Sequence, residues 1–242
     1  MKRVQLSVLL VAGALVAACG GTTVNVAAKP TPPGPVTTYR NVLPGQTAVA
    51  PIDLIQSILD FSPGAASVVH QHTSANLGTV LQGQITIKMP SGNKQASAGE
   101  MLQEPLNQPV QAVNMSSAEA MVAVAFPVLH GAKPTTAVAG QPAPATPNKT
   151  LYTFTLATPT ISGGYSLIQQ VLDFAPGSQT LKQQRGGSGV ITVIQGQMTL
   201  STDGVEKTYV VGDSFSETPG HTLQAFNRGS ADLIVVATFI LA

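Results

Sequence analysis

Two histidines, His70 and His72, are the residues whose type and spacing point most clearly to chemistry. Residues two apart on a β-strand project from the same face, so both imidazoles would face one site. Such a pair could bind a transition-metal ion, preferring nickel, copper or zinc to manganese or magnesium. Two histidines alone make a weak, open site, and a substitute ligand would have to be Glu104, Gln103 or a bound substrate. The alternative is a metal-free pocket in which both histidines act as hydrogen-bonding groups.

The chain that must position this pair contains one long stretch twice. Residues 54–83 (LIQSILDFSPGAASVVHQHTSANLGTVLQG) align with residues 167–196 (LIQQVLDFAPGSQTLKQQRGGSGVITVIQG). The offset, 113 positions, holds without a gap as far as Phe126 and Phe239. The matches cluster at glycine, proline and apolar positions, where backbone geometry and core packing restrict the choice of residue. A period this long indicates a duplicated domain and not a solenoid repeat.

The apolar pattern inside each repeat is typical of short strands. In the first repeat the expected strands fall within residues 54–61, 79–87 and 121–126, and the chain ends on a strand at residues 233–241. Turn signals such as Pro63-Gly64 recur at short intervals, which predicts an all-β sandwich or barrel. A helix over residues 53–60 is rejected because the run is short and Pro-Gly closes it in both repeats.

The N-terminus has the features of a bacterial export signal. Residues 1–18 contain a short basic start and an apolar run that is too short to span a membrane. Val16-Ala17-Ala18-Cys19 resembles the lipobox of bacterial lipoproteins, which implies a diacylglyceryl group on Cys19 and cleavage before it. The alternative is an ordinary signal peptide with an incidental cysteine. Residues 19–38 then form a flexible tether, and the mature protein is expected to be extracytoplasmic and anchored to a membrane.

Composition excludes several function classes. Lys and Arg number 12 against 11 Asp and Glu, so there is no basic excess to bind nucleic acid. The single cysteine rules out an intramolecular disulfide. The sequence also lacks a Gly-x-Ser-x-Gly elbow and a phosphate-binding loop.

Both repeats resemble the cupin family of small jelly-roll barrels. The first repeat matches the family's two motifs at Gly64, His70, His72, Gly83, Gly99, Pro105 and Asn114. The second repeat matches them at Gly177, Gly196, Gly212, Gly220 and Asn227. The resemblance implies two cupin-type jelly-roll β-barrels in tandem, at residues 39–129 and 151–242, joined by a Pro/Ala/Thr-rich linker at residues 130–150.

The resemblance also implies a depleted metal site. Cupin metals such as Mn, Fe, Ni or Zn are typically held by three histidines and a carboxylate. The first repeat keeps His70 and His72, but Asn76 stands at the carboxylate position and Val110 at the third histidine. Glu104 resembles a glutamate that accompanies the family's histidine without being one of the usual four ligands. These residues are expected to surround a pocket in the first barrel.

The second repeat keeps none of the four ligands. The residues at its ligand positions are Gln183, Arg185, Gly189 and Leu223. An arginine at such a position repels a cation, so no metal is expected in the second barrel.

The sequence thus predicts a membrane-anchored bicupin lipoprotein that binds a small polar ligand or serves as a scaffold, without catalysis. Its cofactor would be none, or a weakly bound divalent transition metal. Association into a homo-oligomer through the barrels is left open. The alternative is a metal-dependent cupin oxygenase or isomerase in which only the first barrel is active.

Overall fold

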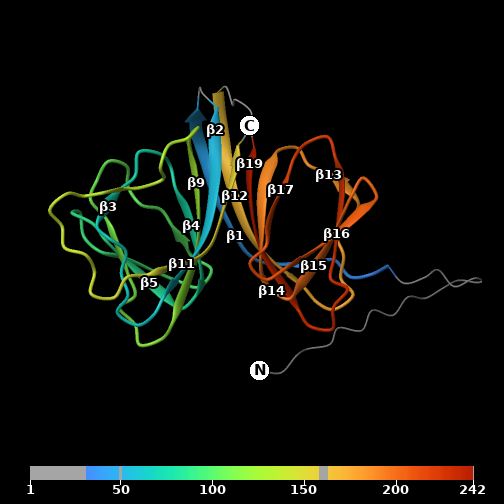
Figure 1. Ribbon diagram of the computed structural model, residues 1–242, viewed down its shortest axis with the longest axis horizontal. Helices are drawn as coiled ribbons and strands as arrows, with labels where there is room; N and C mark the ends of the chain where they lie inside the picture. The colour runs from blue at the N-terminus through green and yellow to red at the C-terminus, as the bar shows by residue number, and fades with distance from the viewer. Residues whose placement is uncertain (1–30, 49–50, 158–162, 242) are drawn as a thin grey trace, which may run out of the picture. The chain divides into compact units, whose positions relative to one another are not determined.

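The structure is a computed structural model that describes residues 31–48, 51–157 and 163–241 of the chain. Every regular element in these ranges is a β-strand, which confirms the predicted all-β class (Figure 1). These same ranges contain no helix that is long and apolar enough to cross a membrane. The predicted signal peptide and Cys19 lie outside the described residues.

The first repeat folds into strands that surround one core. They are β2 (Ile52–Phe61), β3 (His70–Gln71), β4 (Leu77–Gln82), β5 (Gln84–Lys88), β6 (Lys94–Ser97), β7 (Met101–Leu102), β8 (Gln111–Val113) and β9 (Ala120–Leu129). A five-stranded sheet in the order β11-β2-β9-β4-β7, in which the edge strand is β11 (Lys149–Ala157), faces a three-stranded sheet in the order β6-β5-β8. Residues from both sheets, such as Phe61, Val80 and Ile85, are buried together between them.

The second repeat reproduces this arrangement. Its strands are β12 (Gly163–Phe174), β13 (Gln183–Gln184), β14 (Ser188–Gln195), β15 (Gln197–Thr202), β16 (Val205–Val210), β17 (Ser214–Glu217), β18 (Thr222–Phe226) and β19 (Leu233–Leu241). Together with β1 (Val36–Ala48) they form a five-stranded sheet, β1-β12-β19-β14-β17, and a four-stranded sheet, β13-β18-β15-β16. Phe174, the repeat equivalent of Phe61, is buried in the matching place. This is the predicted pair of jelly rolls.

The two repeats exchange their first strands. β1 (Val36–Ala48) pairs antiparallel with β12 of the second repeat, and β11 (Lys149–Ala157) pairs antiparallel with β2 of the first. Each large sheet therefore takes one edge strand from the other half of the chain. β1 also begins at Val36, inside the segment that the sequence assigns to the tether.

A shared interface joins the two large sheets. Leu54 and Leu77 of the first repeat are buried in one cluster with Leu167 and Val190 of the second. Within this interface the buried amide of Gln56 donates to Thr192 Oγ1 at 2.7 Å. Apolar packing with a satisfied polar contact fixes the register between the sheets.

Two equivalent glycines show why both repeats carry the same turn residue. Gly83 and Gly196 have φ values of 70° and 75°, in the left-handed region that L side chains rarely adopt. A Cβ at Gly83 would lie 2.3 Å from the Glu119 carbonyl oxygen, and one at Gly196 would lie 2.6 Å from that of Asp232. Both space and backbone conformation therefore require glycine between the two strands.

The segment between the repeats packs along the first barrel. We refer to residues 132–148 as the strap. Its strand β10 (Thr136–Ala137) pairs with β3, and Ala66 exchanges backbone hydrogen bonds with Thr146 and Asn148 at 2.9 and 3.0 Å. The sequence predicts only a Pro/Ala/Thr-rich linker here, whereas the structure attaches the segment to the barrel at both ends.

Candidate metal centre

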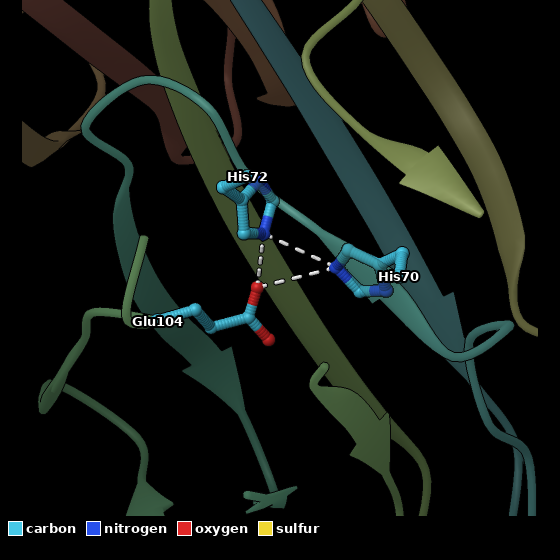
Figure 2. A group of neighbouring side chains, drawn as sticks. All are labelled: His70, His72 and Glu104. Carbon is cyan, nitrogen blue, oxygen red and sulfur yellow. Dashed lines mark hydrogen bonds and ion pairs between the residues drawn. The ribbon is translucent and has the colours of Figure 1, made fainter. Parts of the chain in front are cut away.

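Backbone pairing on both sides holds His70, the first histidine of the pair, in place. His70 exchanges hydrogen bonds with Val110 at 2.9 and 2.8 Å, and its other edge pairs with Ala137 of the strap. The two-residue spacing places both imidazoles on one face, as the sequence predicts. Their Nε2 atoms lie 3.1 Å apart (Figure 2).

Glu104 approaches the same point from the segment that follows β7. Its Oε2 atom lies 2.5 Å from His72 Nε2 and 3.3 Å from His70 Nε2. His70, His72 and Glu104 together form a group whose ligand atoms all lie within 4.8 Å of one another. The sequence suggests Glu104 only as a substitute ligand, and the structure brings it to the histidines.

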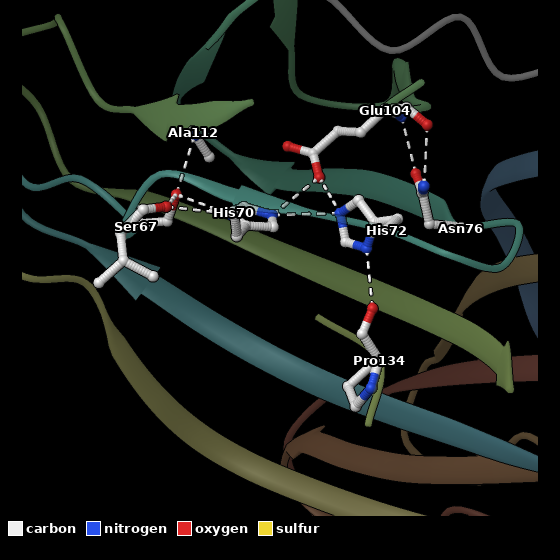
Figure 3. A network of polar contacts seen from close by, with 8 residues as sticks. Ser67, His70, His72, Asn76, Glu104, Ala112 and Pro134 are labelled. Atoms are coloured by element: carbon white, nitrogen blue, oxygen red, sulfur yellow. Dashed lines mark hydrogen bonds and ion pairs between the residues drawn. The ribbon is translucent and has the colours of Figure 1, made fainter. Parts of the chain in front are cut away.

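Asn76 holds the backbone of Glu104. The Glu104 amide donates to Asn76 Oδ1 at 2.7 Å, and Asn76 Nδ2 donates to the Glu104 carbonyl at 2.9 Å (Figure 3). Asn76 thus occupies the family's carboxylate position without supplying a charge. It fixes the residue that does supply one.

Carbonyl groups determine the tautomer of both histidines. His70 Nδ1 lies 2.9 Å from the Val68 carbonyl oxygen, and His72 Nδ1 lies 3.0 Å from that of Pro134. A carbonyl oxygen can only accept, so each Nδ1 carries the hydrogen and each neutral ring turns a lone pair on Nε2 inward. Two lone pairs and a carboxylate oxygen then converge. Such a group of acceptors is stable only with protons or a metal ion between them.

Burial and charge shift the pKa values of two members of this group. Burial by itself lowers the pKa of His70, but the hydrogen bond to Glu104 and that carboxylate's charge outweigh it and raise the pKa. For Glu104, burial acts to raise the pKa, but the hydrogen bonds and charges of His70 and His72 lower it to about 2. The carboxylate is therefore ionised and ready to neutralise a cation.

The three ligand atoms fit a divalent metal. Two ligand atoms that each lie about 2.1 Å from one ion, at right angles, are about 3.0 Å apart. The separations of 3.1 and 3.3 Å are close to this value, and the 2.5 Å contact would have to open by about half an ångström. Backbone carbonyls behind both imidazoles are the usual outer partners of metal-binding histidines. The donor set, two histidines and one carboxylate, suits iron, nickel or zinc and leaves further coordination positions open.

A cavity of about 420 Å³ lies beside this group. Most of its wall is apolar and comes from both sheets of the first barrel, including Leu59, Ile87 and Phe126. Four strap residues also line it: Pro134, Thr135, Pro147 and Asn148. The strap is therefore one wall of the cavity, a role that its composition did not indicate.

Val110 has a different place from the one that the sequence assigns it. Its side chain is 1% exposed and packs in the barrel core beside Ile87 and Ala96. In the described part of the chain it is not among the residues that line the cavity. Its backbone pairs with His70, so it supports the centre without facing it.

The second barrel holds an ion pair where the first has the three ligands. Arg185 takes the place of His72 and pairs with Glu217, the repeat equivalent of Glu104. The guanidinium also lies over the ring of Phe239, 4.8 Å from its centroid, as His72 stacks on Phe126 at 5.4 Å. A fixed positive charge thus already neutralises the buried carboxylate.

The remaining histidines lie away from the centre. His130 pairs with Asp53 at 2.8 Å and His221 pairs with Asp203 at 2.6 Å, and both imidazoles are more than half exposed. A backbone hydrogen bond from Gly131, followed by the hydrogen bond from His130, lowers the pKa of Asp53. These pairs stabilise loops on the protein surface.

Comparison with known proteins supports the fold alone. A scan against protein-family profiles and a search of curated proteins both find no match. Among solved structures, the chain is similar to AerE from Microcystis aeruginosa, with a TM-score of 0.55, 15% identity, and coverage of 87% of this chain and 98% of that one. It is also similar to vicilin from hazelnut, Corylus avellana, with a TM-score of 0.59, 12% identity and coverage of 77% and 74%.

An oxalate decarboxylase from Bacillus subtilis gives a further match. One structure of this enzyme has a TM-score of 0.57 and 13% identity, with coverage of 85% of this chain and 77% of that one. Another structure of it is described by its Mn(II) centres. The chain therefore has the bicupin fold, two cupin-type jelly rolls in one polypeptide, and the resemblance inferred from the sequence motifs is confirmed at the level of fold.

Proposed function

We propose that the protein is a membrane-anchored, extracytoplasmic bicupin whose first barrel binds a small molecule at a divalent metal held by His70, His72 and Glu104. The convergence of two imidazole lone pairs and a carboxylate beside a cavity carries this proposal. A bound divalent metal would supply a Lewis acid with open positions for a ligand. In this role binding is the function, and the second barrel is structural.

Each residue around the centre has a defined part in this function. The carbonyls of Val68 and Pro134 accept the Nδ1 hydrogens of the histidines, so each Nε2 is directed inward and can bind a metal once it has lost its proton. Glu104 supplies the negative charge, and Asn76 fixes its backbone. The mainly apolar wall lowers the local dielectric constant, which strengthens electrostatic interactions at the centre.

Location outside the cytoplasm is part of the proposal and rests on the N-terminal sequence. The lipobox-like Val16-Ala17-Ala18-Cys19 and the Pro-rich residues after it support a lipid anchor at Cys19. More than one acyl chain would give stable anchoring, because each buried CH₂ contributes about 0.8 kcal/mol.

A second candidate function is metal-dependent catalysis, as an oxygenase or isomerase. The observation that favours it is the ligand count, because three protein ligands leave positions open next to the cavity. Catalytic metal sites keep an open position of this kind, whereas structural sites are closed. Turnover that needs the loaded first barrel would select this candidate over binding alone.

Calorimetric titration of metal into chelator-treated protein tests the proposal. We expect one Zn²⁺ or Ni²⁺ per chain for the wild type, and loss of this site in His70→Ala. His221→Ala is the matched control, since His221 pairs with Asp203 away from the centre. If the wild type binds no metal stoichiometrically, or if His70→Ala binds it as well as the control does, the proposal is wrong.

A further inference from the structure

We infer that the ligand of the first barrel is a small organic anion with an apolar body, and that its anionic head binds at the metal. This inference rests on the proposed function and names the chemical class that the cavity selects. It differs from the small polar ligand expected from the sequence. The charges around the cavity, the nature of its wall and the position of the strap each support it.

The charge balance selects an anionic head. With both histidines neutral, a divalent ion and the Glu104 carboxylate leave one net positive charge at the centre. The described residues that line the cavity include no lysine or arginine, and Glu104 is their one carboxylate. A buried net charge is costly unless it is paired. A ligand with one negative charge would neutralise the centre, whereas an ammonium group would be repelled by it.

The wall selects an apolar body. Away from the centre the cavity is lined mainly by aliphatic and aromatic side chains from both sheets, such as Leu59, Ile85 and Val124. A polar body would leave hydrogen-bonding groups unsatisfied against these side chains. A volume of about 420 Å³ lies within the range of small-ligand sites. The cavity therefore favours a carboxylate or enolate attached to a hydrocarbon chain or ring.

The strap joins the two requirements. The carbonyl of Pro134 orients His72, and the adjacent Thr135 lines the cavity. At the other end of the strap, Pro147 and Asn148 also line it. One segment thus contacts a metal ligand and borders the space for the ligand body. A body that fills the cavity would pack against the strap, which makes the strap part of ligand selection.

Binding of simple carboxylates to the Zn²⁺-loaded full-length protein tests this inference. Acetate, butanoate and hexanoate share one head, and hexylammonium carries the opposite charge on a six-carbon chain. Calorimetry should show affinity rising up to about fourfold for each added methylene, since each buried CH₂ contributes this much to binding. We expect hexanoate to bind at least about tenfold more tightly than acetate, and hexylammonium not to bind.

Two variants separate the head from the body. Glu104→Gln should abolish metal binding and with it hexanoate binding. Val124→Phe narrows the cavity without altering a metal ligand, so it should keep the metal and reduce hexanoate affinity to that of acetate. Thermal unfolding of each variant verifies that it is folded. If a variant does not fold, the comparison of acetate, butanoate and hexanoate on the wild type tests the inference by itself.

The outcomes distinguish the inference from the proposed function. If Zn²⁺ binds one-to-one but hexanoate binds no more tightly than acetate, or hexylammonium binds equally well, the inference is wrong and the metal centre stands. If no metal binds, both are wrong. Tight hexanoate binding to metal-free protein would overturn the assignment of the head to the metal.

Discussion

Arg185 pairs with Glu217 in the second barrel at the position where, one repeat earlier, His72 meets Glu104. The two glutamates are both largely buried, and each basic partner lies against an equivalent phenylalanine. One framework thus presents a buried carboxylate in both barrels. In the second barrel the guanidinium of Arg185 neutralises it, and in the first two histidines take the place of that fixed cation.

Removal of Arg185 should destabilise the protein strongly. Glu217 is 4% exposed, so Arg185→Ala would leave a buried carboxylate without a counter-charge, which costs about 3–5 kcal/mol. Arg228→Ala is the matched control, because its bond with Glu206 lies on the surface, where solvent screens ion pairs and they contribute little to stability. Urea unfolding measures both. Equal effects would show that the Arg185–Glu217 pair is not a stabilising element.

The metal-free protein should be most stabilised by its three-residue centre at mildly acidic pH. The pKa of Glu104 falls from 4.5 to about 2 on folding, so its contribution is present above pH 4.5 and is lost as the pH falls toward 2. The pKa of His70 rises above 6.5, so its contribution is present below pH 6.5 and is lost as the pH rises through the folded value. The two windows overlap between pH 4.5 and 6.5.

Glu104→Gln provides the measurement of this pH dependence. In the presence of chelator, the difference in unfolding free energy between wild type and Glu104→Gln should be largest between pH 4.5 and 6.5 and should decline on either side. Metal affinity, in contrast, should increase with pH, because His70 binds a metal only after it has lost its proton. A stability difference that does not vary with pH would argue against the proton-linked contacts.

Alanine at the inter-strand glycines should be costly. Gly83→Ala or Gly196→Ala would place a methyl group under 3.0 Å from a backbone carbonyl, in addition to the strain of positive φ. We expect each substitution to lower the free energy of unfolding by more than about 2 kcal/mol. Gly64 also has a positive φ, but the space around an added Cβ is open. Gly64→Ala should therefore lower the free energy of unfolding by only about 1 kcal/mol. Thermal unfolding compares the three, and equal losses would mean that the close approach adds nothing.

Replacing Cys19 should release the protein from membranes. Cys19→Ser removes the thiol that a lipobox needs, so the chain should lose its lipid, and either appear in soluble fractions or remain unprocessed. Mass spectrometry of the mature N-terminus and membrane fractionation measure these results. A wild-type chain that is soluble and carries an unmodified Cys19 would refute the anchor.

Local patterns in the sequence predicted the strands, the turns and the histidine pair. Period-two spacing was sufficient to place His70 and His72 on one face, and the repeated Gly83 and Gly196 marked the inter-strand turn. The exchange of β1 and β11 could not be predicted in this way. The two repeats have similar strand patterns, so either strand suits either sheet, and only the three-dimensional arrangement selects between them.

The rest of the candidate site depends on long-range contacts that carry little local signal. Glu104 meets the histidines because Asn76 holds its backbone across 28 residues. Its recurrence as Glu217 in the second repeat does not identify its partners. The strap has the composition of a linker, and no periodicity shows that Pro134 will accept a hydrogen bond from His72. Those contacts depend on tertiary packing, which local spacing does not report.

Anomalous diffraction from crystals soaked with Zn²⁺ tests the proposed metal centre. We expect one peak at the zinc absorption edge in the first barrel, within coordination distance of His70 Nε2, His72 Nε2 and Glu104 Oε2. We expect no peak between Arg185 and Glu217 in the second barrel. A first barrel without zinc, with the three side chains still bonded to one another, would contradict the proposal, as would zinc bound only at His130 or His221.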